Sequence, residues 1–318
     1  MPWLPPTLAF LVTGLTLAVL RRSKFASLMG DVPNERSLHN GIVPRIGGTG
    51  MLAGLAAAWL VLPQAGQPLT LAAAGYVLLY ALSVVDDFHS LPVVARLATH
   101  LAVATAWCWA ALDGPAWAAV FAVLLIAWAI NSYNFMDGSD GLAGGMTVFG
   151  FGTYAIGAVL GDNMLIATLC AAVAASAIAF LLFNFHPASL FLGDSGSVPL
   201  GYLAATLGWY GVDENLWPPV LPILAFFPFL FDATFTLFRR VLRREQVWKP
   251  HREHLYQLVI RNGIGHREVA LASYALMCVF SVIALTTIGT DPRIQIMTVG
   301  VALFLCILST KWRRFRDC

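Results

Sequence analysis

Residues 116–160 read AWAAVFAVLLIAWAINSYNFMDGSDGLAGGMTVFGFGTYAIGAVL, two long apolar runs joined by the polar stretch 131–145. The polar stretch holds two carboxamides, two carboxylates and four glycines within fifteen residues. Each apolar run is close to the roughly 20 residues that cross a bilayer as a helix. A hydrophobic core has no use for that polar mixture, so the pattern predicts two membrane-spanning helices joined by a functional loop.

The rest of the chain has the same character. Of its 318 residues 58% are hydrophobic and 11% charged, and the mean hydropathy is +0.74, whereas soluble domains are about a quarter charged. The sequence therefore predicts an all-α, polytopic integral membrane protein that forms a single domain, residues 1–318. We predict eleven transmembrane helices, at residues 3–20, 47–63, 69–85, 96–112, 116–132, 143–160, 164–183, 196–211, 217–238, 268–288 and 294–310.

Basic residues divide the loops between these spans into two sets. One set, with the carboxyl-terminal tail, holds 18 of the 19 Lys and Arg residues, and the other holds only Arg293. Because cytoplasmic loops are rich in Lys and Arg, this predicts an amino terminus outside and a carboxyl terminus in the cytoplasm. Arg21, Arg22 and Lys24 follow the first run without a small-residue cleavage site, so we expect a retained span rather than a signal peptide.

The polar clusters fall on the predicted cytoplasmic side. Asn134, Asp137 and Asp140 are spaced three apart, which places them on one side of a helical turn or lets them converge in a loop. Oxygen ligands without sulfur suit Mg²⁺, or Mn²⁺, bound together with phosphate. A glycine-rich turn capped by Asp and Asn is the structural alternative, and the number of polar ligands favours the metal site. The five cysteines stand singly, without metal-ligand spacing.

Further carboxylates end or begin other spans. Asp86 and Asp87 follow the third span, where adjacent carboxylates repel each other unless a cation lies nearby; a solvated helix cap is the alternative. Asp194 lies in the sequence FLGDSGS, residues 191–197, at the mouth of another span, whose free N–H groups favour an anion such as phosphate. Asp232, about two turns inside the ninth span, is expected to pair with a neighbouring helix or a basic residue.

Two loops carry basic groups. The sequence HREHLYQ, residues 251–257, offers guanidinium and imidazole donors for a pyrophosphate, and it lacks the Cys and further His of a zinc site. The loop 31–48 presents Arg36 and Arg45 as candidate phosphate or headgroup contacts, and taken alone it could be a simple loop. Four other histidines are interpreted as structural: His89, His100, His186 and His266.

Five ordered blocks resemble one family, the polyprenyl-phosphate N-acetylhexosamine-1-phosphate transferases: DVPNERSLH…PRIGG, VVDDF, NSYNFMDGSDGLAGG, FLGDSGS and HREHLYQ. The chain looks more like the branch that initiates O-antigen than the peptidoglycan branch, whose last block is richer in histidine. The resemblance implies an Mg²⁺-dependent transfer of an N-acetylated sugar 1-phosphate from a UDP-sugar to undecaprenyl phosphate, releasing UMP. It implies the cytoplasmic face of the bacterial inner membrane, with membrane lipid and no nucleic acid as partners.

The resemblance also implies residue roles. Asp194 and Asn134 would ligate the metal, Asp86 would act on the lipid phosphate, and Phe191 would lie against uracil. The candidate catalytic residues are Asp86, Asp87 and Asp137, and the candidate substrate-binding residues are Asn131, Asp140, Phe191, Arg45, Arg96, His251, Arg252 and His254.

The chemistry is compatible with these roles. One phosphoanhydride is broken and one is formed, so a cation and an arginine would offset the repulsion between the phosphates. Asp86 could position the lipid phosphate, relay its last proton or attack to form an aspartyl phosphate, and the sequence leaves all three open. Two other functions remain as alternatives: a transporter or lipid flippase, which predicts ionisable residues near the bilayer midplane where only Asp232 comes close, and a lipid-linked diphosphate hydrolase.

Overall fold

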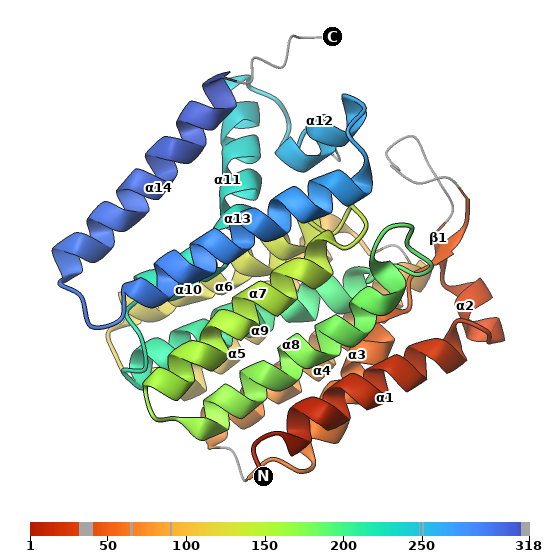
Figure 1. Ribbon diagram of the computed structural model, residues 1–318, viewed down its shortest axis with the longest axis horizontal. Coiled ribbons are helices and arrows are strands. Elements are labelled where there is room, and N and C mark those ends of the chain that lie inside the picture. Colours follow the sequence, from red (N-terminus) through yellow and green to blue (C-terminus); the bar gives the residue numbers. More distant parts are fainter. Residues whose placement is uncertain (32–40, 64–65, 90, 248, 250, 313–318) are drawn as a thin grey trace.

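The computed structural model describes residues 1–31, 41–63, 66–89, 91–247, 249 and 251–312, with side chains up to residue 308. Over this part the protein is a bundle of helices with a two-stranded hairpin at one end (Figure 1). The all-helical class predicted from the sequence is confirmed. Four of the basic residues that predict the cytoplasmic side lie outside the described residues: Arg36, Arg313, Arg314 and Arg316.

The elements follow the predicted spans closely, with short helices added between them. The helices are α1 Leu4–Leu20, α2 Lys24–Leu28, α3 Gly47–Trp59, α4 Gln67–His89, α5 Val93–Ala111, α6 Ala116–Phe135, α7 Leu142–Leu160, α8 Met164–Asn184, α9 Asp194–Asp213, α10 Val220–Ala225, α11 Phe227–Leu242, α12 Leu255–Arg261, α13 His266–Thr286 and α14 Pro292–Trp312. Strand β1 (Gly30–Asp31) pairs antiparallel with β2 (Val43–Pro44).

Six of the described helices are long and apolar enough to cross a membrane: α4, α5, α6, α7, α8 and α13. Leu4–Leu20 and Pro292–Leu308 are shorter apolar helices. These helices make the chain a polytopic membrane protein, while the count of eleven spans and the sides of the two termini stay predictions.

The ninth predicted span, residues 217–238, is not a continuous helix. Helix α10 ends at Ala225 and α11 begins at Phe227. Pro228 follows at the start of α11 and lacks the N–H that would bond the carbonyl of Leu224. The apolar run is therefore broken into two helices, and α11 can take a direction of its own.

Helix α9 lies in the interior and positions the site. It packs against both α4 and α6, and most of its residues are buried. A Cβ at Gly201 would lie 2.8 Å from the carbonyl oxygen of Ala129 and from the Cα of Ile130, so glycine permits this close approach of α9 to α6. The contact fixes Asp194, the first residue of α9, near the last turns of α6.

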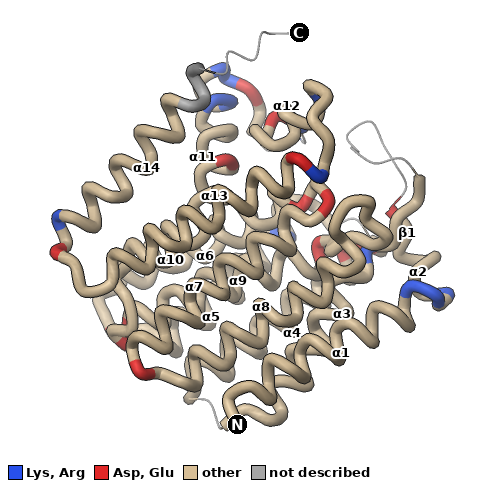
Figure 2. The backbone as a smooth tube through the Cα atoms, in the orientation of Figure 1, with Lys and Arg blue, Asp and Glu red and all other residues tan. Residues whose placement is uncertain are grey.

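Basic residues gather at one end of the bundle, which we call the charged end (Figure 2). Blue segments, with several red ones, cluster where α12, β1 and α2 lie, whereas the opposite end carries red segments and a blue segment at the start of α14. The charge separation seen along the sequence is thus a separation in space.

Candidate functional site

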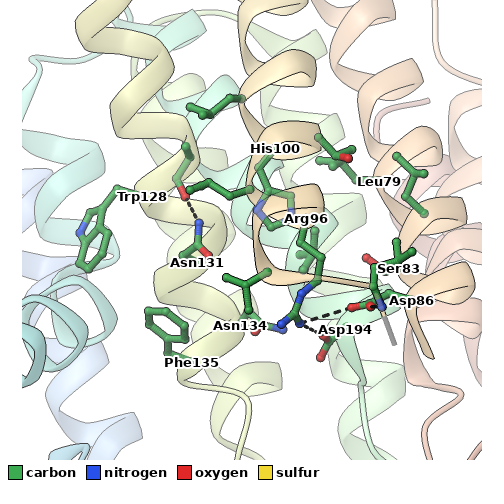
Figure 3. A pocket seen from close by; sticks show the side chains of 18 of the residues that line it. Leu79, Ser83, Asp86, Arg96, His100, Trp128, Asn131, Asn134, Phe135 and Asp194 are labelled. Atoms are coloured by element: carbon green, nitrogen blue, oxygen red, sulfur yellow. Dashed lines mark hydrogen bonds and ion pairs between the residues drawn. The ribbon is translucent and has the colours of Figure 1, made fainter. Parts of the chain in front are cut away.

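A cavity of about 650 Å³ lies at the charged end, between α4, α5, α6 and the segment that joins α11 to α12 (Figure 3). Pockets for small ligands typically measure about 300–1,000 Å³. Its polar lining comes from Ser83, Asp86, Arg96, Thr99, His100, Asn131, Asn134, Asp194, Lys249, His251, His254 and Gln257. Its apolar lining includes Leu79, Leu82, Leu97, Leu101, Leu124 and Val198.

Arg96, in the first turn of α5, lies between two carboxylates (Figure 3). Its Nη1 is 3.3 Å from Asp86 Oδ2 and 3.8 Å from Asp194 Oδ2. The backbone N–H of Leu91 donates to the other oxygen of Asp86, at 2.6 Å. Both oxygens of Asp86 are therefore engaged, and Arg96 joins the end of α4 to the start of α9.

Asp87 is not among the residues that line this cavity. Successive side chains on a helix are about 100° apart, and Asp86 and Asp87 both lie in the last turn of α4. Asp87 Oδ1 is 3.6 Å from Arg45 Nη1, and Arg45 also pairs with Asp31. Asp87 Oδ2 is buried without a hydrogen-bond partner among the described residues. The predicted repulsion within the pair is thus eased because each carboxylate meets a different arginine.

Two of the sequence blocks dock on each other through the main chain. The N–H of Phe191 donates to Pro44 O (2.8 Å), and the N–H of Gly47 donates to Phe191 O (2.9 Å). A Cβ at Gly48 would lie 2.5 Å from the backbone N of Gly196, so a side chain there would push the blocks apart. This docking brings Arg45 beside the loop of Asp194. Neither Arg45 nor Phe191 lines the cavity.

Asn131 and Asn134 face the cavity from α6. The helix continues to Phe135, one turn beyond the predicted span, so the two amides lie one turn apart on one face. Asn131 Nδ2 donates to the carbonyl of Ala127 (2.7 Å). Asn134 Nδ2 donates to Ser197 Oγ (3.1 Å), so the amide oxygen is the atom of Asn134 that can coordinate a cation.

Asp137 lies in the loop after α6 and beside the start of α9. Its carboxylate accepts a hydrogen bond from the backbone of Gly193. Burial, and then the charge of Asp194, raise the pKa of Asp137 to about 7. Asp137 and Asp194 therefore lie close enough to repel each other when both are ionised.

Asp140 lies apart from this group. Its Oδ2 accepts from His186 Nδ1 (2.6 Å) and from the backbone N–H of Ala188 (3.1 Å), and His266 Nδ1 is 3.9 Å from Oδ1. Of the three residues spaced three apart, Asn134 and Asp137 lie near the start of α9, whereas Asp140 pairs with His186 beyond the end of α8. The reason is that α6 ends at Phe135 and the chain leaves the helical path after it. His186 and His266 hold this loop, as expected of structural residues.

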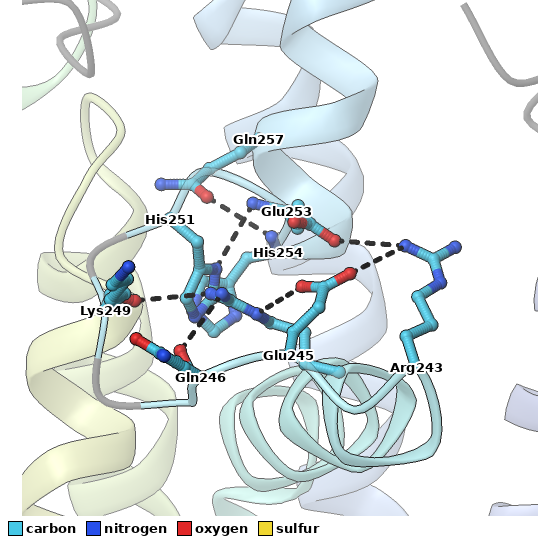
Figure 4. Close-up of polar contacts among 9 residues, drawn as sticks. Arg243, Glu245, Gln246, Lys249, His251, Glu253, His254 and Gln257 are labelled. Atoms are coloured by element: carbon cyan, nitrogen blue, oxygen red, sulfur yellow. Dashed lines mark hydrogen bonds and ion pairs between the residues drawn. The ribbon is translucent and has the colours of Figure 1, made fainter.

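The segment between α11 and α12 folds around the buried guanidinium of Arg240, and Figure 4 shows its residues Glu245, Gln246 and Lys249. Arg240 Nε donates to Glu245 Oε2 (2.9 Å), and its other nitrogens donate to the carbonyls of Lys249 (3.4 Å) and Gln246 (3.3 Å). Arg243 Nη1 is 3.3 Å from Glu253 Oε2. These contacts place Lys249 at the cavity.

The histidine block is only partly at the cavity. His251 and His254 line it, whereas Arg252 does not. Burial lowers the pKa of His251 to about 4, and His254 and Arg240 contribute to this. His251 is therefore neutral at pH 7, and it meets a ligand through hydrogen bonds rather than as a cation.

The structure adds cavity residues that sequence reasoning missed. His100, expected to be structural, lines the cavity, and its Nδ1 is buried without a hydrogen-bond partner among the described residues. The sequence could have indicated this, because His100 lies one turn after Arg96 and therefore on the same side of α5. Lys249 and Trp128 also line the cavity. Lys249 had no comparable signal, because its place depends on the loop that Arg240 holds.

The donors near Asp194 are of the kind that Mg²⁺ prefers. Among the described residues no three His, Cys, Asp or Glu side chains are arranged to hold a metal ion by themselves. Mg²⁺ is usually bound by one or two carboxylates together with substrate phosphates and water. Asp194, the amide oxygen of Asn134 and the unpartnered Oδ2 of Asp87 fit that pattern.

Sequence comparisons agree with the motifs. Residues 69–211 match glycosyl transferase family 4. The probable undecaprenyl-phosphate N-acetylglucosaminyl 1-phosphate transferase of Bacillus subtilis (strain 168) is 29% identical, over 94% of this chain and 88% of that protein. The undecaprenyl-phosphate alpha-N-acetylglucosaminyl 1-phosphate transferase of Yersinia pestis is 27% identical, over 96% and 90%. The decaprenyl-phosphate N-acetylglucosaminephosphotransferase of Mycolicibacterium smegmatis is 27% identical, over 87% and 80%. The resemblance seen in the five blocks is thereby confirmed: residues 69–211 match the model of glycosyl transferase family 4, and the similar proteins carry the names of polyprenyl-phosphate N-acetylglucosaminyl 1-phosphate transferases.

Proposed function

We propose that this protein transfers an N-acetylated sugar 1-phosphate from a UDP-sugar to undecaprenyl phosphate, giving undecaprenyl-diphospho-sugar and UMP. The observation that carries the proposal is the cavity, which joins a charged end to a leucine-lined wall. The names of the relatives supply the reaction class, and they make UDP-N-acetylglucosamine the first donor to test. The relatives do not favour a transporter or flippase.

The two ends of the cavity suit the two parts of a lipid phosphate. Arg96 and Lys249 offer cationic groups to phosphate oxygens. Leu97 and Leu124 line the wall while 44% and 57% of their surface stays exposed, which suits a hydrocarbon chain that enters from the bilayer.

In the proposed reaction an oxygen of the lipid phosphate attacks the sugar-bearing phosphorus of the UDP-sugar. A new P–O–P bond forms as the bond to the UMP oxygen breaks, so UMP leaves with the electron pair. The second pKa of a phosphate monoester is about 6, so much of the nucleophile is ionised at neutral pH. A strong base is therefore not required.

Asp86 is proposed to position the lipid phosphate through Arg96. Both of its oxygens already have partners, Leu91 N–H and Arg96, and this supports positioning over nucleophilic attack. Arg96 in turn reaches toward Asp194, so the guanidinium stands where acceptor and donor phosphates would meet.

We further propose that Asp194 and Asn134 hold Mg²⁺, with Asp87 and Asp137 beside them. When bound, the ion offsets the repulsion between the two phosphate groups. The chain's own contribution is to fix the ligands. Ser197 orients the amide of Asn134, and the packing of α9 fixes Asp194.

The cellular role is also a proposal. The basic residues at the charged end favour a site at the cytoplasmic face of the inner membrane. The blocks resemble the branch that initiates O-antigen or related surface polysaccharides, and this pathway assignment rests on sequence alone.

The test uses purified protein, undecaprenyl phosphate, Mg²⁺ and a panel of UDP-sugars, with UMP release and the lipid product measured together. We expect UMP release that depends on both substrates and is lost in Asp194→Asn. Asp213→Asn is the matched control, because Asp213 is the last residue of the same helix and lies at the opposite end, and it should retain activity. No UMP release with any donor would reject the proposal. Release of phosphate from added undecaprenyl diphosphate, without any acceptor, would instead indicate the hydrolase.

A further inference from the structure

Helix α11 carries a buried polar face that the proposed reaction does not use directly. Asp232, Thr236 and Arg240 are spaced four residues apart, so they lie along one side of the helix. Their exposed fractions are 4%, 1% and 6%. Buried charges are costly unless they are paired and hydrogen-bonded. The hydrogen-bond partners of these side chains therefore show which part of the protein the polar face holds in place.

Asp232 accepts four hydrogen bonds, and three of them come from the start of α12. The donors to Oδ1 are Thr236 Oγ1 (3.0 Å), His254 Nδ1 (3.3 Å) and Leu255 N–H (2.9 Å), and Tyr256 N–H donates to Oδ2 (3.2 Å). The first N–H groups of a helix have no partner within it. Asp232 supplies that partner from another helix and fixes α12 to α11.

The same carboxylate decides which nitrogen of His254 a ligand can reach. A carboxylate only accepts, so Nδ1 of His254 must carry the proton, and Nε2 is left for the cavity that His254 lines. The His254 ring packs against three other rings: His251 at 4.8 Å between centroids, Phe135 at 5.8 Å and Tyr256 at 6.1 Å. With 3% of His254 exposed, the ring has little freedom to turn.

We infer that Asp232 is a positioning residue, which acts through His254 to present Nε2 to the sugar donor. This inference rests on the proposed transfer, since it assigns a partner to a residue of that same site. In the neutral ring Nε2 is an acceptor, so it meets a hydroxyl or N–H group of the donor sugar. The α11 face therefore links the interior of the bundle to the binding of the nucleotide sugar.

The kinetic test compares Asp232→Asn with the wild type. Asparagine keeps the shape of the side chain and removes the charge. We expect the KM for the UDP-sugar to rise about tenfold, as for other residues that orient a ligating histidine, while the KM for undecaprenyl phosphate changes less than threefold. Thr236→Val, which removes a different donor to the same carboxylate, should change both values less than threefold. Equal losses for both substrates would overturn the inference.

A double-mutant cycle isolates the route through His254. In a His254→Gln background, Asp232→Asn should add less than twofold, because its effect already depends on the missing ring. Additive effects would show that Asp232 acts elsewhere and would overturn the inference.

The final experiment does not depend on turnover. In protein labelled with ¹⁵N-histidine, the ring signals of His254 are identified by their loss in His254→Gln. We expect the Nδ1–H tautomer in the wild type at pH 8, and a changed tautomer or shift in Asp232→Asn. An Nε2–H tautomer, or an unchanged spectrum in the variant, would overturn the inference. Absence of UMP release would count against the proposed function, while this spectrum would still decide the role of Asp232.

Discussion

The last turn of α4 directs Asp86 to Arg96 and Asp87 to Arg45, so two chain neighbours contact different parts of the site. Asp86 lines the cavity, whereas Asp87 does not and keeps a buried oxygen without a hydrogen-bond partner among the described residues. The sequence showed the two adjacent carboxylates. It could not show that each one meets a different arginine, because that depends on which sides of α4 face α5 and β2.

This division predicts different kinetic defects. We expect Asp86→Asn to raise the KM for undecaprenyl phosphate roughly tenfold, because Arg96 loses its orienting partner. We expect Asp87→Asn to raise the Mg²⁺ concentration needed for half-maximal activity by a similar factor. Titrations of each substrate and of Mg²⁺ measure both effects. Identical profiles for the two variants would contradict the division, and Asp213→Asn again serves as control.

His251 provides a prediction about pH. Its pKa is lowered from 6.5 to about 4, so between these values the unfolded chain binds more protons than the folded protein. Stability therefore falls as the pH drops through this range and is unaffected by this group above it. We expect the melting temperature of His251→Gln relative to the wild type to rise between pH 7 and pH 5. An equal difference in melting temperature between variant and wild type at pH 7 and pH 5 would contradict the lowered pKa of His251.

At the scale of helices, apolar runs predicted most elements to within a few residues. Helix α8 was expected at 164–183 and spans Met164–Asn184. The extra turn of α6 was missed, because Asn131, Ser132 and Asn134 interrupt the apolar run without interrupting the helix. The break between α10 and α11 was missed for the opposite reason, since hydropathy stays high across it while Pro228 removes a backbone donor.

Contacts between loops were beyond the reach of the sequence. Asp140 pairs with His186, 46 residues away, and Arg45 pairs with Asp87, 42 residues away. Such pairs carry no periodic signal. The sequence therefore predicted the polar composition of the site and could not tell which polar groups meet the cavity.

The α11–α12 segment gives a prediction for an element. Arg240 holds three points of this segment, so Arg240→Gln should lower stability by roughly 1.5–3 kcal/mol and raise the KM for the UDP-sugar as Lys249 loses its place. Arg239→Gln is the matched control, because its guanidinium lies over Phe235 instead, at 5.8 Å from the ring centroid. Thermal unfolding and donor titration measure the effects. Equal behaviour of the two variants would contradict a role for Arg240 in holding the segment.

For the whole molecule, the separation of charge predicts an orientation. In a background whose cysteines are replaced by alanine, Asn262→Cys lies after α12 at the charged end, and Asp113→Cys lies between α5 and α6 at the other end. Both positions are exposed. We expect an impermeant maleimide to label Asp113→Cys in spheroplasts and to label Asn262→Cys after the membrane is opened. The reverse pattern would invert the predicted topology.

The exposed leucines of the cavity wall also determine how the concentration of the lipid acceptor should be expressed. A lipid that enters past Leu97 and Leu124 diffuses in two dimensions, so its supply depends on its mole fraction among bilayer lipids rather than on its amount per volume. Diluting the protein together with its membrane would leave that supply constant, whereas adding inert lipid or detergent would reduce it. The UDP-sugar arrives from water, so its supply depends on its concentration per volume. Dilution with buffer would therefore lower the supply of the sugar donor and leave the supply of the lipid acceptor unchanged.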